Sequence, residues 1–455
     1  MCKRIIAVIV SIFVTITAPF TVYAYDINTP DGVKEAVEGV ISYKSAVLGS
    51  NSVDELLDAL SDKAGTFSSD WYYIALSRYG VNCKNEKSVT ALKKAVDDFY
   101  KEKLETVKVT DLQRVAFALM ACKEDITSVN GHNLLADATY NRDKYRPLDA
   151  QGVNSLSYAL LLLDSKKFDI PKNSGLTRKK LINKILSYEL DDGGFSLFGK
   201  GADVDITSIV LQALAPYKND SKVKKSVEKS LDILSKRQDS CGAYKSFDNK
   251  VTAESTAQVI IALTSLGINP VSDKRFIKNG KTALDGLSVF KTEDGGYSHM
   301  EGLSSNAIAA YQSLCAFVAM HRLFSNKGAF YDFSEKEKSD VKTIKKTIDK
   351  KAVKHKKSVK KSTVSKSINT KTIEATINNN SKIENKVKKK KKKKSKIKVS
   401  IKSAATKKTK ETKLVPKREP KQKNNTKPQP LYYNALVMLS GYILVFSIKR
   451  KRGRT

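Results

Sequence analysis

The same short turn recurs three times along this chain, at a spacing of about fifty residues. Its copies occupy residues 189–195 (ELDDGGF), 238–244 (QDSCGAY) and 291–297 (KTEDGGY). Each copy follows an amphipathic helical pattern and precedes an apolar helical pattern rich in small residues. Regular recurrence of one supersecondary unit is typical of repeat architectures. The sequence therefore predicts an array of helix pairs.

The turn itself predicts a local structure. Its glycines permit a positive φ and close packing of the backbone, and each copy ends in an aromatic residue, namely Phe195, Tyr244 or Tyr297. An aromatic ring at such a joint fills the space between successive helix pairs. We therefore expect these three aromatic side chains to be buried.

Apolar residues recur at helical spacing in two alternating sets of segments. One set is amphipathic and rich in lysine: residues 32–48, 87–103, 128–139, 177–190, 222–238 and 276–290. The other is denser in Ala, Leu and Ile: residues 71–79, 111–122, 154–163, 205–217, 254–266 and 306–324. A helix that is apolar on most sides must be surrounded by other elements. The predicted fold is all-α, an (α/α)6 toroid with the apolar helices inside and the charged ones outside, and an open superhelix of helix pairs is the alternative.

The two ends of the chain predict export and anchoring. Residues 1–24 have the basic start, apolar core and small-residue end of a signal peptide, and the toroid is expected to span residues 25–333. Residues 431–448 are apolar, long enough for a transmembrane helix, and followed by a basic tail over 449–455, which should remain cytoplasmic. We expect an extracellular N-terminal domain held at a cell membrane by one C-terminal span.

The positive charge of the chain is concentrated in one segment. The net charge is +35, and residues 334–430 hold 35 Lys and Arg against 8 Asp and Glu. Such a composition cannot bury a core, so this segment is expected to be a disordered stalk. Its expected partners are the polyanions of a cell wall, and nucleic acid is not expected to be a partner of an exported protein.

The repeat carries a resemblance to a known family. Gln238, Gly242 and Tyr244 resemble the Gln-and-aromatic repeat of the terpenoid cyclase and protein prenyltransferase superfamily. Residues 203–217 and 254–263 resemble the prenyltransferase/squalene oxidase repeat domains found in exported surface proteins of Gram-positive bacteria. The resemblance is clearest over residues 176–324, and it extends more distantly to transcobalamin-like carriers. It implies a toroid that binds its ligand in the central cavity, and the ligands of the superfamily suggest an isoprenoid-like or a corrinoid molecule.

Two motifs bear on catalysis. The cyclases of this superfamily protonate a polyene with an Asp-x-Asp-Asp motif, and Asp205 matches the proton donor while Ile206 stands where the last Asp would be. Capping of the helix that starts near Ile206 is the alternative role of Asp203 or Asp205. Asp239 and Cys241 resemble zinc ligands of the prenyltransferases, but the third ligand is missing, because Asn306 occupies the position of the histidine. Asp205 is thus a weak catalytic candidate, and neither a metal nor a cofactor is expected.

A set of polar residues is predicted to surround one mouth of the central cavity. In a closed ring the N-terminal ends of the inner helices meet there, and convergent amides and carboxylates in a partly apolar hollow suit a weakly polar ligand. The candidates are Asn154, Asp203, Asp205, Glu254, Gln258, Asn306 and Gln312. The predicted function is surface display of a toroid that binds a small ligand or a partner without catalysis. The alternatives are a terpenoid-cyclase-like or prenyl-transferring enzyme, and corrinoid binding or adhesion.

Overall fold

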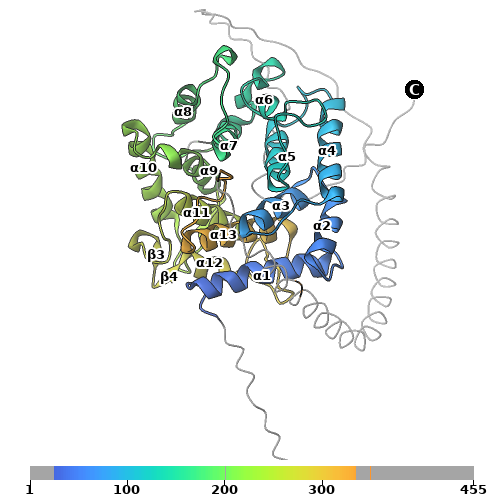
Figure 1. Ribbon diagram of the computed structural model, residues 1–455. Helices are drawn as coiled ribbons and strands as arrows, with labels where there is room; N and C mark the ends of the chain where they lie inside the picture. Colours follow the sequence, from blue (N-terminus) through green and yellow to red (C-terminus); the bar gives the residue numbers. More distant parts are fainter. Residues whose placement is uncertain (1–24, 200, 335–348, 350–455) are drawn as a thin grey trace, which may run out of the picture.

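The computed structural model describes residues 25–199, 201–334 and 349 (Figure 1). The predicted signal peptide, transmembrane helix and basic tail lie outside these residues, and so does the predicted stalk apart from Ser334 and Asp349. In the described part the fold is all-α, as predicted, with two small hairpins as its only sheets.

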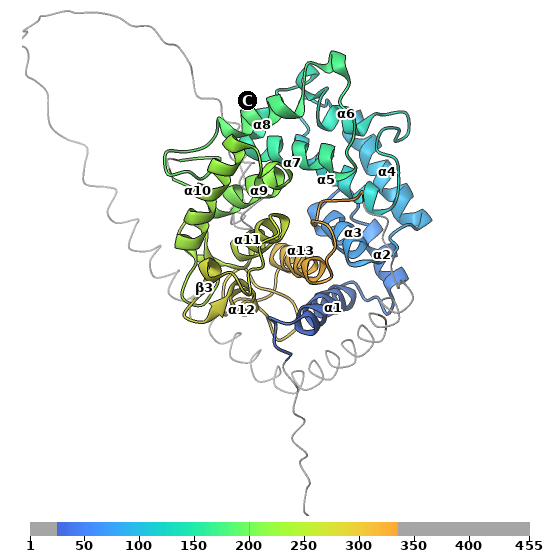
Figure 2. The same cartoon turned by 60° about the vertical axis from the view of Figure 1, so that its left-hand side comes forward.

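Six buried helices contact one another in a closed order. They are α3 (Phe67–Tyr79), α5 (Val109–Ala121), α7 (Gly152–Ser165), α9 (Val204–Leu214), α11 (Ala253–Ser265) and α13 (Ala307–Phe324). Each packs against the next, and α13 packs against α3, so the contacts form a complete circuit (Figure 2). Alanines at the contacts, among them Ala213, Ala257 and Ala309, are buried and let the helices approach closely.

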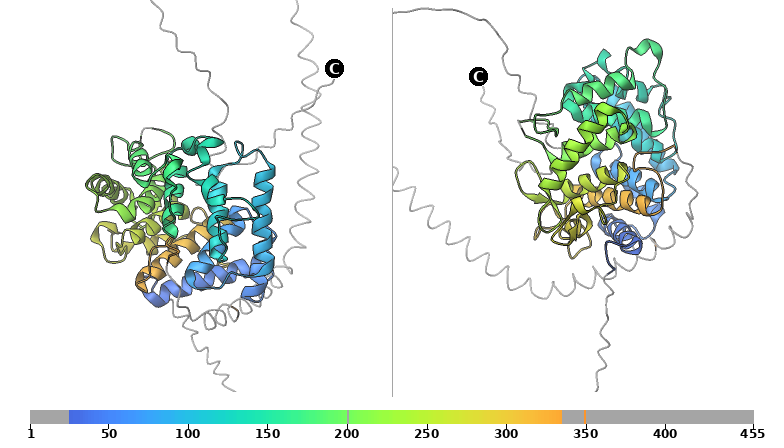
Figure 3. Two further views of the ribbon diagram at one scale, coloured as in Figure 1. Left: turned by 45° about the horizontal axis from the view of Figure 1, so that its top comes forward. Right: turned by 90° about the vertical axis from the view of Figure 1, so that its left-hand side faces the viewer.

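A second set of helices covers the outside of this circuit (Figure 3). It comprises α1 (Pro30–Val47), α2 (Val53–Ser61), α4 (Glu86–Lys101), α6 (Leu134–Ala138), α8 (Arg178–Leu186), α10 (Ser221–Arg237) and α12 (Ala283–Ser288). Contacts join α1 to α13, α4 to α5, α6 to α5, α8 to α7, α10 to α9 and α12 to α11. Short 3₁₀ turns link these elements at Arg142–Lys144, Leu148–Gln151, Lys172–Ser174, Ala215–Tyr217 and Lys274–Phe276.

The outer helices differ from prediction in three places. The segment 276–290 begins with a hairpin, β3 (Ile277–Lys278) and β4 (Lys281–Thr282), because Asn279 and Gly280 both take a positive φ that suits a two-residue turn. The segment 128–139 is helical only in α6, after a turn with positive φ at Asn130 and Gly131. Helix α2 was not predicted.

The three repeated turns have one hydrogen-bond pattern. The backbone N–H groups of Gly193, Gly242 and Gly295 each donate to the carbonyl three residues earlier, and their φ angles are 89°, 90° and 81°. The aromatic residues that follow are buried, with at most 2% of each exposed, which confirms that prediction. The second hairpin, β1 (Tyr244–Lys245) and β2 (Val251–Thr252), continues from the middle turn into α11.

The chain returns to the middle of the circuit after α13. The guanidinium of Arg322 donates to the carbonyls of Gly328 (2.8 Å) and Arg78 (2.9 Å), and Arg78 Nε donates to the carbonyl of Phe330 (2.9 Å). We call residues 328–333 the inner segment. Its Phe330 and Tyr331 are buried among the helices of the circuit. Among the described residues, α13 alone is long and apolar enough to cross a membrane, and most of it is buried here.

Candidate functional site

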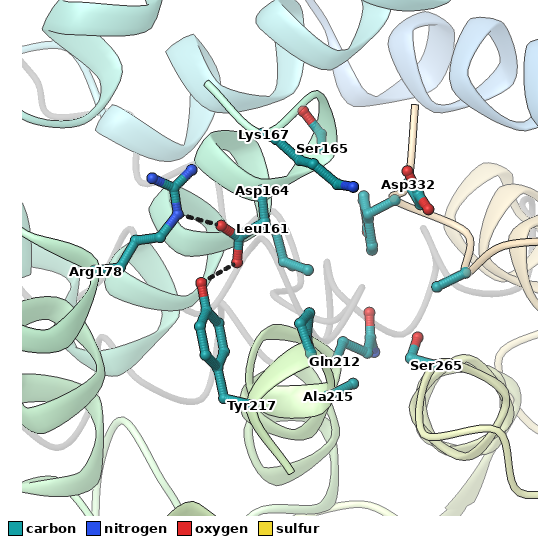
Figure 4. Close-up of a pocket in the computed structure, with 13 residues that line it drawn as sticks. Leu161, Asp164, Ser165, Lys167, Arg178, Gln212, Ala215, Tyr217, Ser265 and Asp332 are labelled. Atoms are coloured by element: carbon teal, nitrogen blue, oxygen red, sulfur yellow. Dashed lines mark hydrogen bonds and ion pairs between the residues drawn. The ribbon is translucent and has the colours of Figure 1, made fainter. Parts of the chain in front are cut away.

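A pocket of about 510 Å³ lies at the C-terminal ends of α7, α9 and α11 (Figure 4). Its apolar wall comes from Leu161, Ala215, Pro216, Ala329 and Tyr331, and polar groups come from Gln212, Ser165 and Ser265. A hollow of this size, mostly apolar with a few polar side chains, is typical of sites for small molecules.

Charged residues occupy one side of the pocket. Arg178 Nε donates to Asp164 Oδ1 (2.6 Å), and the Tyr217 hydroxyl donates to Asp164 Oδ2 (2.8 Å), as Figure 4 shows. Burial raises the pKa of Asp164, while the hydrogen bonds from Arg178 and Tyr217 oppose that rise. These bonds hold the carboxylate of Asp164 in a fixed place at the edge of the pocket. Lys167 and Asp332 line the same pocket from the ends of α7 and of the inner segment.

A second, much smaller cavity lies at the centre of the helix circuit. It has a volume of about 30 Å³, and its aromatic wall is made by Trp71, Tyr158, Tyr311 and Tyr331. Trp71 stacks on Tyr311 with the ring centroids 6.1 Å apart, and it lies 6.2 Å from the Tyr158 ring. A space of this volume holds about one water molecule. The centre of the circuit is therefore nearly filled by side chains.

Three glutamine side chains form a row of hydrogen bonds across the inner helices, which we call the amide row. Gln212 Nε2 donates to Gln258 Oε1 (3.0 Å), and Gln258 Nε2 donates to Gln312 Oε1 (2.9 Å). Gln212 lines the larger pocket, whereas Gln258 and Gln312 line the central cavity. The row therefore connects the two hollows through the protein interior.

Three of the predicted ligand residues meet at the central cavity. Asn154 lies in its wall together with Gln258 and Gln312. Asn154 is only 4% exposed, and its Oδ1 atom has no hydrogen-bond partner. A buried acceptor without a partner costs free energy, so a donor on a bound molecule would stabilise this site.

Two other predicted residues are helix caps. Asp203 accepts hydrogen bonds from the backbone N–H groups of Asp205 (2.8 Å) and Ile206 (3.2 Å), so it is the N-cap of α9. Asn306 accepts from Ile308 and Ala309 at 2.9 Å and caps α13 in the same way. Their side chains satisfy backbone donors, which is the capping role considered for Asp203.

The remaining two predicted residues form a buried acidic pair beside a histidine. Asp205 and Glu254 are 5% and 1% exposed, and Glu254 Oε2 lies 2.8 Å from His299 Nδ1. Burial raises the pKa of Asp205 well above its ordinary value, and the nearby charges of Asp203 and Glu254 raise it further. Neither Asp205 nor Glu254 lines the pocket or the central cavity.

Sequence reasoning missed most of the larger pocket. Its distinctive members, Asp164, Tyr217 and Tyr331, lie at the C-terminal ends of inner helices or beyond them, whereas the prediction considered N-terminal ends. One signal was present: residues 330–333 (FYDF) hold three aromatic residues just after the last helix. Among the described residues, no group of three or more His, Cys, Asp or Glu is arranged to hold a metal.

Comparison with known proteins adds no assignment. No protein-family model matches the chain, and no curated protein matches it.

Proposed function

We propose that this protein is an exported, membrane-anchored (α/α)6 toroid that binds a small ligand within its helix ring and performs no catalysis. The closed circuit of six buried helices supports the toroid. The resemblance to prenyltransferase/squalene oxidase repeat domains, the apolar residues 431–448 and the lysine-rich stalk support its place at a Gram-positive cell surface. The anchor is the membrane contact, and the stalk binds anionic wall polymers.

The observation that carries the binding function is the pocket at the ends of α7, α9 and α11. It is large enough for a small organic molecule, it is mainly apolar, and Gln212, Ser165 and Ser265 offer polar groups that can orient a ligand. Isoprenoid-like and corrinoid molecules are the ligand classes that the resemblance suggests. A pocket of about 510 Å³ suits a short isoprenoid better than a corrinoid, whose ring system is much larger.

The test is native mass spectrometry of the full chain purified from its source cells. We expect a co-purifying small molecule that is lost when Ser265→Phe fills the pocket and is retained in Ser77→Phe. Ser265 and Ser77 lie near the C-terminal ends of two inner helices and are similarly half-buried, but only Ser265 lines the pocket. Absence of a bound molecule from the unmodified chain, or equal retention by both variants, would contradict the proposal.

One observation favours a second candidate, a terpenoid-cyclase-like activity. Asp205 is buried, and its raised pKa favours the protonated form that an acid catalyst needs. Because Asp205 lines neither hollow, a polyene would reach it only if a new space opened beside α9. The test is incubation of the full chain with linear polyenes and analysis of the products. Cyclised products that Asp205→Asn abolishes would support this activity, and no turnover by the unmodified chain would refute it.

A further inference from the structure

Tyr331 lies at both hollows of the helix circuit. Its side chain lines both the larger pocket and the central cavity. The amide row also passes from one hollow to the other. The two hollows are therefore adjacent, and Tyr331 is the residue common to their walls.

That ring is surrounded by aromatic groups from three inner helices. The Tyr331 centroid lies 5.1 Å from that of Phe117, 6.3 Å from that of Tyr158 and 6.4 Å from that of Trp71. Burial raises the pKa of the Tyr331 and Tyr158 hydroxyls, and the neighbouring Tyr158 adds to the rise for Tyr331. Edge-to-face packing around a phenol is an environment that would also suit a bound aromatic molecule that bears a hydroxyl.

Backbone hydrogen bonds hold the inner segment that carries Tyr331, in addition to the packing of its buried aromatic side chains. Arg78 donates to the carbonyls of Ala329 (3.4 Å) and Phe330 (2.9 Å), and the Phe333 N–H donates to the Ser165 carbonyl (2.7 Å). The segment contains no helix or strand. Withdrawal of Tyr331 would break such bonds and remove its ring from Trp71, Phe117 and Tyr158, so a ligand must replace those ring contacts.

We propose that the interior of the helix circuit is one binding chamber for an aromatic group that bears a hydroxyl. Tyr331 occupies this chamber until such a ligand replaces it. The proposal rests on the ligand-binding function, names a ligand class other than the two that the resemblance suggests, and adds a regulation. Withdrawal of Tyr331 joins the central cavity to the pocket. The unpartnered Asn154 Oδ1 in the cavity wall then accepts a hydrogen bond from the ligand.

The chain contains a built-in reporter for this exchange. Trp71 is its one tryptophan, it is 9% exposed, and it contacts Tyr331 directly. Tryptophan emission of the full chain therefore reports on the chamber. The probe is p-cresol, which reproduces the tyrosine side chain, and toluene is the matched probe without a hydroxyl.

We expect p-cresol to change the Trp71 emission saturably and to bind Tyr331→Ala at least tenfold more tightly than the unmodified chain. A resident competitor lowers the apparent affinity, and the substitution removes it. Toluene should bind Tyr331→Ala more weakly than p-cresol. In the unmodified chain, saturating p-cresol should speed hydrogen exchange at the amide of Phe333. Phe195→Ala opens a buried site elsewhere and should leave the p-cresol affinity at the chamber unchanged.

Equal p-cresol affinity in Tyr331→Ala and the unmodified chain would overturn the proposal. So would benzylammonium binding more tightly than p-cresol, because a cation would then be the preferred ligand. If Tyr331→Ala does not fold, Tyr331→Leu provides the same comparison with a smaller void. A co-purifying ligand without any effect of Tyr331 substitution would refute this chamber and leave the proposed function standing. Binding of p-cresol as expected, with no ligand co-purifying from cells, would support the chamber and contradict the proposed function.

Discussion

Acidification should destabilise this protein through His321, which lies in the last turn of α13. Its ring packs edge-on against Tyr79, with the centroids 5.0 Å apart. Burial, and to a lesser degree the charges of Lys327, Arg322 and Lys34, together lower the pKa of His321 to about 4. A helix C-terminus ordinarily favours a charged histidine, so burial and the neighbouring cations outweigh that effect here.

The pKa difference gives the sign and the size of the effect. Because His321 has a pKa of about 4 when folded and 6.5 ordinarily, the unfolded chain binds the proton more readily. The stability contribution is complete above pH 6.5 and is lost progressively as the pH falls toward 4. A tenfold change in proton affinity is worth about 1.4 kcal/mol, which sets an upper limit of about 3.4 kcal/mol. His321 keeps some solvent contact, so screening reduces our expectation to roughly 1.5–2 kcal/mol.

The assay is urea unfolding of the full chain and of His321→Gln between pH 7.5 and pH 4. Carboxylates titrate in both proteins, so the difference between the two free energies of unfolding isolates the histidine. We expect this difference to shift by roughly 1.5–2 kcal/mol in favour of the variant as the pH falls. Parallel curves over the whole range would refute the reasoning, because they would mean that His321 titrates alike in the folded and unfolded chains.

Three further substitutions test the packing of the helix circuit by denaturant unfolding. Arg114→Met should cost about 3–5 kcal/mol, because it leaves the buried carboxylate of Asp70 (2.9 Å away) without its charged partner, and adding Asp70→Leu should recover part of that loss. Gly242→Ala should destabilise more than Gly175→Ala, since both have a positive φ but only the first would place a Cβ within 2.1 Å of a backbone oxygen; equal losses would contradict this. Gln258→Leu should cost about 1–3 kcal/mol by interrupting the amide row, and a neutral result would show that the row contributes no net stability.

The inner helices could be predicted closely from sequence alone. The segment predicted over 306–324 is α13 (Ala307–Phe324), and the one over 254–266 is α11 (Ala253–Ser265). Helices that are apolar on most sides have closely spaced apolar residues at helical periodicity, so few other structures fit their sequence. The outer segment 276–290 was predicted as one helix, and that prediction is wrong over residues 277–282, which form a hairpin. Asn279 and Gly280 decided it locally in favour of the hairpin.

The central cavity was predicted only in part. Asn154, Gln258 and Gln312 do lie at one hollow, because polar residues in the first two turns of converging helices come together. The aromatic contacts of Tyr331 could not be predicted in the same way. They join a residue after the last helix to Trp71 and Tyr158, which lie far away along the chain. No local pattern encodes such contacts, since they depend on where the inner segment re-enters the helix circuit.

The place of the larger pocket follows from the difference between the two ends of a helix. Polar residues at N-terminal ends often satisfy backbone donors, as Asp203 does for α9, and such residues are then less available to a ligand. At the other end, α9 stops at Leu214, three residues before the end of the predicted segment. Pro216 has no backbone N–H to give to the carbonyl of Gln212, so it ends the α-helix and the chain continues as a short 3₁₀ turn. Pro216, Gln212 and Tyr217 all line the pocket. The early end of α9 thus leaves space between α7 and α11, and the pocket forms there rather than among the capping residues.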